Sequence, residues 1–367
     1  MDTNRTANLR KLWRQAHRWT GLGIGWLLAL VALCGSLLVV APELDRWLNP
    51  KLFIAAPVDP AAPEAPAAAS LEQIRTSLSG LFGEKASLTM RLPRNADDTL
   101  RITVRSPNWN GSYYVHPATG QELGLRGEYE GIVNLAHKFH SNLFLDDTGR
   151  AILAAISLLY VALLVSGLIL WWPRKWPAAF KVEWRKGGLR TLFDLHRTAG
   201  AVLGLLMVVT LATGAYMAWR PLAQFVTTIS GEQPVAPPKL GESASPADTP
   251  ATIDDMARRA QALFPDDRLT YIQIPAEAKR PIRIRLRLAD DPHPNGRTSV
   301  WLHPKTGEIL AVDRWDRVDP GAQALSYVFP LHTGELGGSA LEALVFLFGL
   351  TLCGLGFSGI WLWWHRR

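Results

Sequence analysis

Four segments of this sequence carry no charged side chain over a length that can cross a lipid bilayer. At about 1.5 Å per residue, a helix of about 20 apolar residues spans the hydrocarbon core. Lipid offers the backbone no hydrogen-bond partner, so such runs fold as helices. The first run is too long for the apolar core of a signal peptide and is expected to remain as a helix. We predict four transmembrane helices, over residues 19–42, 151–172, 198–219 and 343–364.

Charged residues are distributed unevenly around these segments. The residues before the first span, between the second and third, and after the fourth hold 14 Lys or Arg against 3 Asp or Glu, whereas the remainder is net acidic. Basic residues stay on the cytoplasmic side of a membrane. We therefore expect both termini and the middle loop in the cytoplasm and the two long loops outside. The formal net charge of +7 then reflects membrane orientation, and no nucleic-acid partner is expected.

The chain contains an internal repeat. A shift of 192 residues superposes 140–172 on 332–364, including the first histidine, a Ser-Gly pair and two tryptophans. A shift of 179 residues superposes 17–35 on 196–214, including a His-Arg pair and three glycines. Such fixed offsets indicate two copies of one structural unit. Each copy runs from an inner histidine through a span and an outer segment to an outer histidine and a second span.

Each outer segment begins with a linker that is rich in Pro and Ala, at 56–69 and 234–250. Such a composition builds no core. Apolar residues then recur with a helical period and afterwards alternate with polar residues as in strands. Helices are expected at 70–82 and 253–264, and strands at 87–94, 99–105, 112–116, 269–274, 282–288 and 298–303. The sequence thus predicts two small α+β domains.

The motifs bordering these segments resemble those of a known family. His116 and His303 each open a His-Pro-x-Thr-Gly turn after the third strand, similar to the turns of PepSY domains. Both halves also have a His-x-x-x-Gly-x-x-x-Gly opening and a Ser-Gly-x-x-Leu-Trp-Trp closing, as in the PepSY-associated transmembrane family. The resemblance covers nearly the whole chain. It departs from the family at the two turns, which usually begin with Asp.

This resemblance implies a bacterial inner-membrane protein of the haem-containing ferric-siderophore reductase type, with two periplasmic PepSY-like domains. Such a protein is a haem-dependent oxidoreductase that carries electrons across the membrane, reduces a ferric siderophore and releases Fe(II). Some relatives have a fused flavin- and nicotinamide-binding module that this sequence lacks, so a separate cytoplasmic or membrane electron donor is expected. The sequence has no C-x-x-C-H motif, so its haem would be haem b, without thioether links.

Four of the nine histidines lie at matched membrane edges, His17 and His196 inside and His140 and His332 outside. Ionisable residues at such positions are costly to bury and mark functional sites. Two imidazoles on opposite sides of a porphyrin fill both axial positions and give a centre that transfers electrons. We therefore predict two bis-histidine haems, one held by His17 and His196 and one by His140 and His332.

Other residues near these edges leave alternatives open. His137 lies one helical turn before His140, and His365 ends the last span, so either is an alternative to a predicted ligand. Arg18 and Arg197 follow the inner histidines, and either they pair with haem propionates or they serve only as cytoplasmic anchors. The histidines that open the two PepSY-like turns are expected to cap those turns.

The predicted fold class is an integral membrane α-helical protein with four transmembrane helices, two periplasmic α+β PepSY-like domains and an internal two-fold repeat. Each predicted PepSY-like domain includes its linker. The expected boundaries are 1–42 for the cytoplasmic N-terminus and first helix, 43–150 for the first PepSY-like domain, 151–172 for the second helix, 173–197 for the cytoplasmic loop, 198–219 for the third helix, 220–342 for the second domain, and 343–367 for the fourth helix and cytoplasmic C-terminus.

Two other functions are compatible with parts of the sequence. The outer domains have strand edges that recruit peptides or partner proteins, so a non-enzymatic membrane module is the main alternative. A metal permease is less favoured, because no span carries an acidic residue in mid-membrane. Nucleotide-driven transport and hydrolysis are disfavoured, because the sequence has no phosphate-binding glycine loop, no Ser/His/Asp pattern and no H-E-x-x-H motif.

Overall fold

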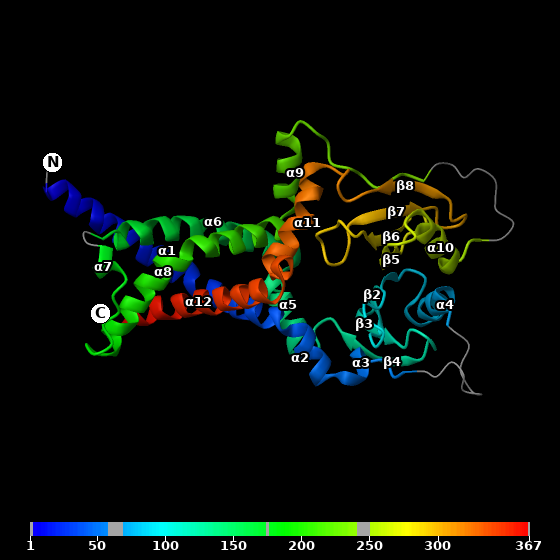
Figure 1. Ribbon diagram of the computed structural model, residues 1–367, viewed down its shortest axis with the longest axis horizontal. Coiled ribbons are helices and arrows are strands. Elements are labelled where there is room, and N and C mark those ends of the chain that lie inside the picture. The colour runs from blue at the N-terminus through cyan, green and yellow to red at the C-terminus, as the bar shows by residue number, and fades with distance from the viewer. Residues whose placement is uncertain (1–2, 58–68, 174–175, 241–249, 366–367) are drawn as a thin grey trace. The chain divides into compact units, whose positions relative to one another are not determined.

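The computed structural model describes residues 3–57, 69–173, 176–240 and 250–365. Much of both predicted linkers lies outside these described residues. The chain forms two compact units, each assembled from separated parts of the sequence (Figure 1). A helical unit contains Met1–Ala41, Leu135–Leu222 and Val328–Arg367, and a sheet unit contains Pro42–Asn134 and Ala223–Tyr327.

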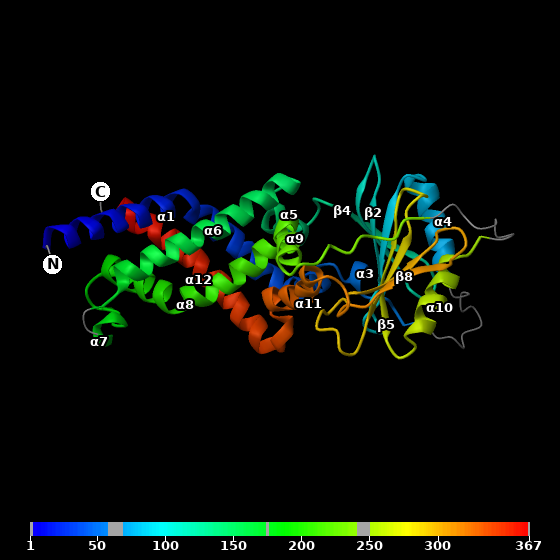
Figure 2. The same ribbon diagram turned by 90° about the horizontal axis from the view of Figure 1, so that it is seen from above.

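Four long helices build the helical unit, which confirms the prediction from hydropathy. They are α1 (Thr3–Val39), α6 (Asp146–Trp171), α8 (Gly188–Ala218) and α12 (Gly338–Trp364). Among the described residues, these are the helices long and apolar enough to cross a membrane. Because α1 and α8 each pack against both α6 and α12, α1 and α8 lie diagonally opposite one another. The start of α1 and the end of α12 lie at the same end of the bundle (Figure 2).

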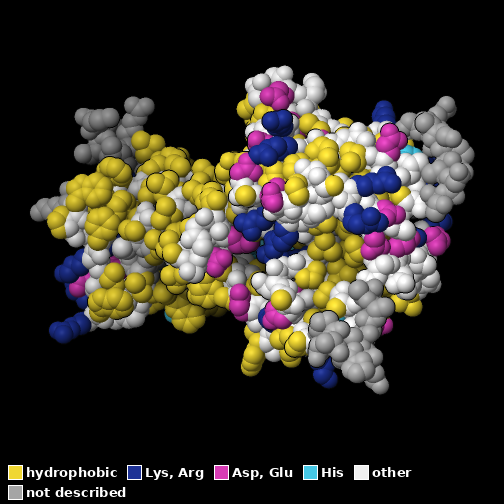
Figure 3. Space-filling view, turned by 45° about the vertical axis from the view of Figure 1, so that its right-hand side comes forward, with side chains coloured by type: hydrophobic (Ala, Val, Ile, Leu, Met, Phe, Trp, Pro, Cys, Tyr) yellow, Lys and Arg dark blue, Asp and Glu magenta, His cyan; other side chains and the backbone are white. Residues whose placement is uncertain are grey.

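Apolar side chains occupy both the outside and the centre of this unit. Leu158 and Leu205 expose 74% and 68% of their surface on α6 and α8, and hydrophobic side chains cover the visible face of the helices (Figure 3). Water penalises such a surface, whereas lipid accepts it. The centre is filled by Leu28, Tyr160 and Met207. The helical unit is therefore a membrane-spanning bundle with an apolar core.

The sheet unit contains one antiparallel sheet to which both repeats contribute. Its strands run in the order β4-β3-β2-β1-β5-β6-β7-β8, with β1 paired to β5. The two α+β repeats predicted from the sequence are thus joined edge to edge. The first repeat supplies β1 (Ser87–Arg91), β2 (Leu100–Arg105), β3 (Asn110–Val115) and β4 (Glu122–Gly127), and the second supplies β5 (Arg268–Ile274), β6 (Ile282–Arg287), β7 (Thr298–Leu302) and β8 (Ile309–Asp313).

Helices α4 (Leu71–Phe82) and α10 (Ile253–Leu263) cover one face of the sheet. Ser70 and Thr252 begin them with capping boxes. Each helix start also binds a carboxylate from the other repeat, because Asp254 accepts from the backbone N–H of Leu71 at 2.9 Å and Glu72 accepts from that of Ile253 at 3.1 Å. Both repeats share a single hydrophobic core beneath these helices.

Short helices connect the strands to the bundle. Asp45 of α2 (Ala41–Leu48) binds Arg126 of β4 through two hydrogen bonds of 2.7 and 2.6 Å. Both side chains are only 7% exposed, so the charge of this arginine is neutralised by a buried carboxylate. The remaining short elements are α3 (Pro50–Phe53), α5 (Ile132–Asn142), α7 (Trp176–Ala179), α9 (Arg220–Ile229), α11 (Pro320–Thr333) and the 3-10 turn η1 (Glu335–Gly337).

Candidate functional site

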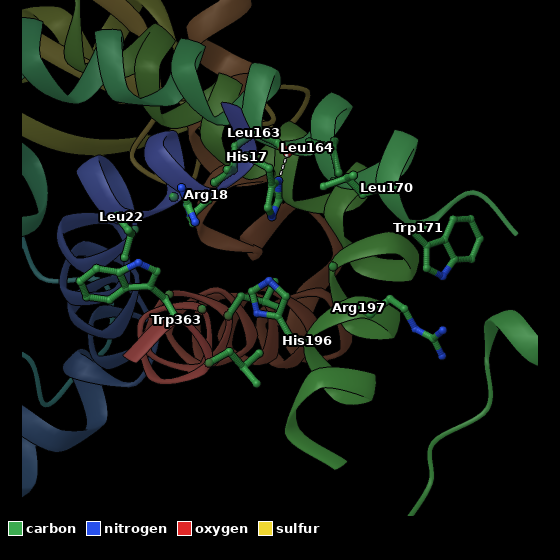
Figure 4. A pocket seen from close by; sticks show the side chains of 18 of the residues that line it. His17, Arg18, Leu22, Leu163, Leu164, Leu170, Trp171, His196, Arg197 and Trp363 are labelled. Carbon is green, nitrogen blue, oxygen red and sulfur yellow. Dashed lines mark hydrogen bonds between the residues drawn. The ribbon is translucent and has the colours of Figure 1, made fainter. Parts of the chain in front are cut away.

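The structure brings the four histidines at the membrane edges together as two pairs. His17 of α1 and His196 of α8 face one another across the bundle, with ring centres 6.4 Å apart (Figure 4). His140 of α5 and His332 of α11 face one another at the opposite end of the helices, with ring centres 5.9 Å apart. These are the pairs that the two repeat offsets match.

The hydrogen bonds of the inner pair define which ring nitrogen is free. His17 Nδ1 lies 3.0 Å from the hydroxyl oxygen of Ser166, and His196 Nδ1 lies 2.8 Å from that of Ser358. Each serine hydroxyl donates to a backbone carbonyl, that of Leu163 or its counterpart in the second repeat. The serine oxygens are thus left as acceptors, and each Nδ1 is the protonated nitrogen. The Nε2 atom of each ring keeps its lone pair.

In the outer pair, backbone carbonyls determine that Nδ1 is the protonated nitrogen. His140 Nδ1 lies 2.8 Å from the carbonyl oxygen of Val31 on α1, and His332 Nδ1 lies 2.9 Å from that of Thr210 on α8. A carbonyl accepts but never donates, so both Nδ1 atoms donate. All four imidazoles therefore present a free Nε2, and a hydrogen bond at the other nitrogen is the usual way in which proteins orient a metal-binding histidine.

A glycine on a neighbouring helix lies against each imidazole. A Cβ atom added at any of these positions would lie only 2.7 to 3.3 Å from the Cε1 atom of the histidine beside it. Any larger residue would therefore crowd the ring. The glycine–histidine pairs are Gly35 with His140, Gly167 with His17, Gly214 with His332 and Gly359 with His196.

Three of these glycines follow a hydroxyl residue that also contacts a histidine. Ser166 and Ser358 bind the inner pair, and Thr213 Oγ1 lies 3.1 Å from His332 Nδ1. At the fourth position Cys34 replaces the hydroxyl residue. From the sequence these four glycines were recognised only as matched positions of the two repeats, Gly35 with Gly214 and Gly167 with Gly359, and their contacts with the histidines were not predicted.

The separation of the paired rings suits two imidazoles on opposite sides of one metal. A metal–imidazole bond is about 2 Å long, so the two nitrogens would be about 4 Å apart and the ring centres roughly 6 Å apart. Both measured separations are near this value. The inner pair also borders a cavity of about 840 Å³, whose walls include Tyr160, Leu355 and Trp363. That volume is in the range of cofactor pockets, about 300–1,000 Å³, so the inner site has room for a cofactor.

Comparison with protein families identifies the chain. The model of the PepSY-associated TM region matches residues 14–366, and these include all four paired histidines. This chain belongs to the PepSY-associated transmembrane family. No curated protein sequence matches it.

Arginines border the inner cavity of this PepSY-associated protein. Arg18 lies over the Trp19 ring, 5.0 Å from its centre. Arg197 lies 3.4 Å from the buried carboxylate of Asp194, and its Nε atom is buried without a hydrogen-bond partner. Both side chains line the cavity, but Arg197 is partly committed to Asp194. Two more arginines, Arg10 and Arg14, also line it, although they were not predicted as site residues.

The other histidines of this family member lie apart from the two pairs. His365 stacks on Trp361 of its own helix, with ring centres 4.3 Å apart, and is exposed. His137 is exposed on α5. His116 and His303 accept backbone N–H groups two and three residues ahead, so they cap their turns as expected. The geometry therefore favours the predicted ligands over both alternatives.

Proposed function

We propose that this protein carries electrons through two b-type haems to a ferric siderophore and releases Fe(II). The observation that supports the proposal most strongly is the pair of facing histidines at each end of the bundle, each with a free Nε2. A haem with two axial imidazoles supplies a one-electron couple and no open coordination position. In this role His17 and His196 would hold the inner haem, and His140 and His332 the outer one.

The bundle holds the two sites at a fixed separation. Eighteen residues separate His17 from Gly35 on α1, and the same number separates His196 from Gly214 on α8. At about 1.5 Å per residue, each interval is roughly 27 Å along the helix. Leu28, Ile156 and Met207 pack together in the buried core of the bundle. The arginines at the inner site offer partners for propionate carboxylates.

The proposed reaction requires no acid–base catalysis by the protein. One electron converts the Fe(III) chelate to an Fe(II) chelate, and the oxygen ligands release Fe(II) because these hard donors prefer Fe(III). The electron comes from a separate cytoplasmic or membrane-bound reductant. This assignment makes the protein a ferric-chelate oxidoreductase of the bacterial inner membrane, with lipid around the four helices and both termini in the cytoplasm.

The proposed function is tested by the visible absorption spectrum of the protein and by its reduction of a ferric chelate. Purified protein should show a sharp Soret band that shifts on addition of dithionite, and the reduced protein should be reoxidised by a ferric chelate, with Fe(II) appearing in a ferrozine trap. A red protein that no ferric chelate reoxidises would contradict iron reduction and point to another electron acceptor. A colourless protein would instead favour the non-enzymatic module, with its sheet unit binding a peptide or partner protein.

The proposed orientation is tested with topology reporters. The charge bias motivates the prediction, because the sequence before the first span, between the second and third, and after the fourth holds 14 basic and 3 acidic residues. Reporters fused after Arg185 and at Arg367 should report the cytoplasm, and reporters inserted at Gly120 and Gly307 should report the periplasm. An outward signal at Arg185 would reverse the electron path.

A further inference from the structure

The sheet face opposite α4 and α10 carries a row of arginines that no part of the electron path uses. The strand registers place Arg101, Arg91, Tyr271 and Arg285 side by side on the four central strands. The neighbouring row contains Thr103, Thr89, Gln273 and Arg283, with Trp301 beside Arg283. These side chains lie on the face opposite the core, because their strand neighbours Met90, Ile102, Ile272 and Ile284 are fully buried.

The four arginines of this face have no carboxylate partner. Among the described residues, no carboxylate oxygen lies within 4.0 Å of the charged nitrogens of Arg91, Arg101, Arg283 or Arg285, whereas Arg126 is fully neutralised by Asp45. Two carboxylates lie near enough to favour the charged arginines, but neither forms an ion pair with them. Asp313 accepts from the Trp301 indole at 2.7 Å, and Asp291 accepts from the backbone N–H of His293 at 2.9 Å.

The two repeats orient these arginines in the same way. Arg101 Nε donates to the Ser112 hydroxyl at 3.1 Å, and Arg283 Nε donates to the Ser299 hydroxyl at 2.9 Å. Trp301 lies 5.0 Å from the Arg283 guanidinium. These bonds use the Nε atoms and hold the outer nitrogens in place. Because Arg101 and Arg283 lie three strand spacings apart, they bracket a site roughly 14 Å wide.

Arg285 lies at the β6 end of the row, where one of its outer nitrogens donates to the carbonyl oxygen of Gly296. Its guanidinium lies 5.5 Å from the centre of the Tyr271 ring, and its Nε atom is buried without a hydrogen-bond partner. Burial and the neighbouring Arg283 and Arg297 lower the pKa of Arg285 to about 9. Burial and Arg297 likewise lower the pKa of Arg283 to about 10. Both remain protonated at neutral pH, so the face holds positive charge that an anion would stabilise.

We propose that this arginine face, defined by Arg91, Arg101, Arg283 and Arg285, binds a small anionic metal chelate with aromatic donor rings. The inference rests on the proposed function and specifies its substrate class as a ferric chelate of net negative charge, such as a tricatecholate. Guanidinium groups bind the anionic oxygens, and Tyr271 and Trp301 stack against the rings. A neutral hydroxamate chelate offers neither the charge nor the rings.

Gallium(III) chelates test this binding separately from electron transfer, because Ga(III) is not reduced under these conditions. Quenching of tryptophan fluorescence in the full-length protein should report tight binding of Ga(III) tricatecholate and weaker binding of Ga(III) citrate and of a neutral Ga(III) trihydroxamate. Arg91→Gln and Arg101→Gln should each raise the Kd of the tricatecholate by about tenfold, the size expected for one charged hydrogen bond. Raising the salt concentration from about 0.05 to about 0.5 M should also weaken binding.

Arg258→Gln is the matched control, because Arg258 pairs with Asp255 on α10 and is 77% exposed. It should leave the Kd unchanged. The proposal is overturned if Arg91→Gln and Arg101→Gln bind the tricatecholate as tightly as the parent while keeping its melting temperature. It is also overturned if the neutral trihydroxamate binds as tightly as the tricatecholate. If the gallium chelate binds as expected but no ferric chelate reoxidises the protein, the binding site stands and the reductase function fails.

Discussion

Replacing either His17 or His196 by alanine should remove about half of the bound haem, because each substitution leaves one of the two proposed sites with a single axial ligand. The double variant should lose no more than either single variant, since the two residues act on one centre and their effects are not additive. Pyridine haemochrome content per protein, measured after purification, checks this. The outer site should keep its own spectrum, since its ligands lie one bundle length away.

His365→Ala is the matched control for this experiment. His365 lies at the same end of the bundle but stacks on Trp361 and is exposed, so its removal should leave the haem content unchanged. If both single variants at the inner pair retain the full haem content, the ligand assignment is wrong. If His365→Ala lowers the content instead, the last helix supplies the inner ligand.

Replacing His332 by alanine should abolish reduction of the ferric chelate while leaving the inner haem reducible. The ring centres of His332 and His140 are 5.9 Å apart, and the proposed outer haem depends on both residues. Without it, electrons from the donor would reach the inner site and stop there. Stopped-flow spectra of the dithionite-reduced variant mixed with a ferric chelate, with ferrozine present, should therefore show slow reoxidation and little Fe(II).

His137→Ala provides the control for the outer site. His137 lies one helical turn from His140 on α5 but is exposed, so this variant should reduce the chelate at the parental rate. A His332→Ala protein that passes electrons as fast as the parent would show that the outer pair is not the exit. The residual haem spectrum would then show whether the site had formed at all.

The four spans and the repeat were predictable because their signals are local. An uncharged apolar run of about 20 residues forms a helix in lipid, whatever residues surround it in the sequence. The α4 and α10 helices and six of the strands were also predictable within a few residues, since their apolar residues follow a clear period and Ser70 and Thr252 carry capping signals. The strands β4 and β8 were missed. They are the edge strands of the sheet, and β4 contains two glycines, so its own residues give little strand signal.

The repeat offsets matched His17 with His196 and His140 with His332, and the sequence by itself determined which histidines correspond. Only the tertiary structure decided that corresponding histidines also face one another, because that depends on how α1 packs relative to α8 and how α5 packs relative to α11. Neighbouring helices also supply the oxygen atoms that accept from each Nδ1 and the glycines that lie against the rings. The joining of both repeats through β1 and β5 was beyond sequence reasoning for the same reason, since strand pairing between distant segments is set by the shared core and not by either strand alone.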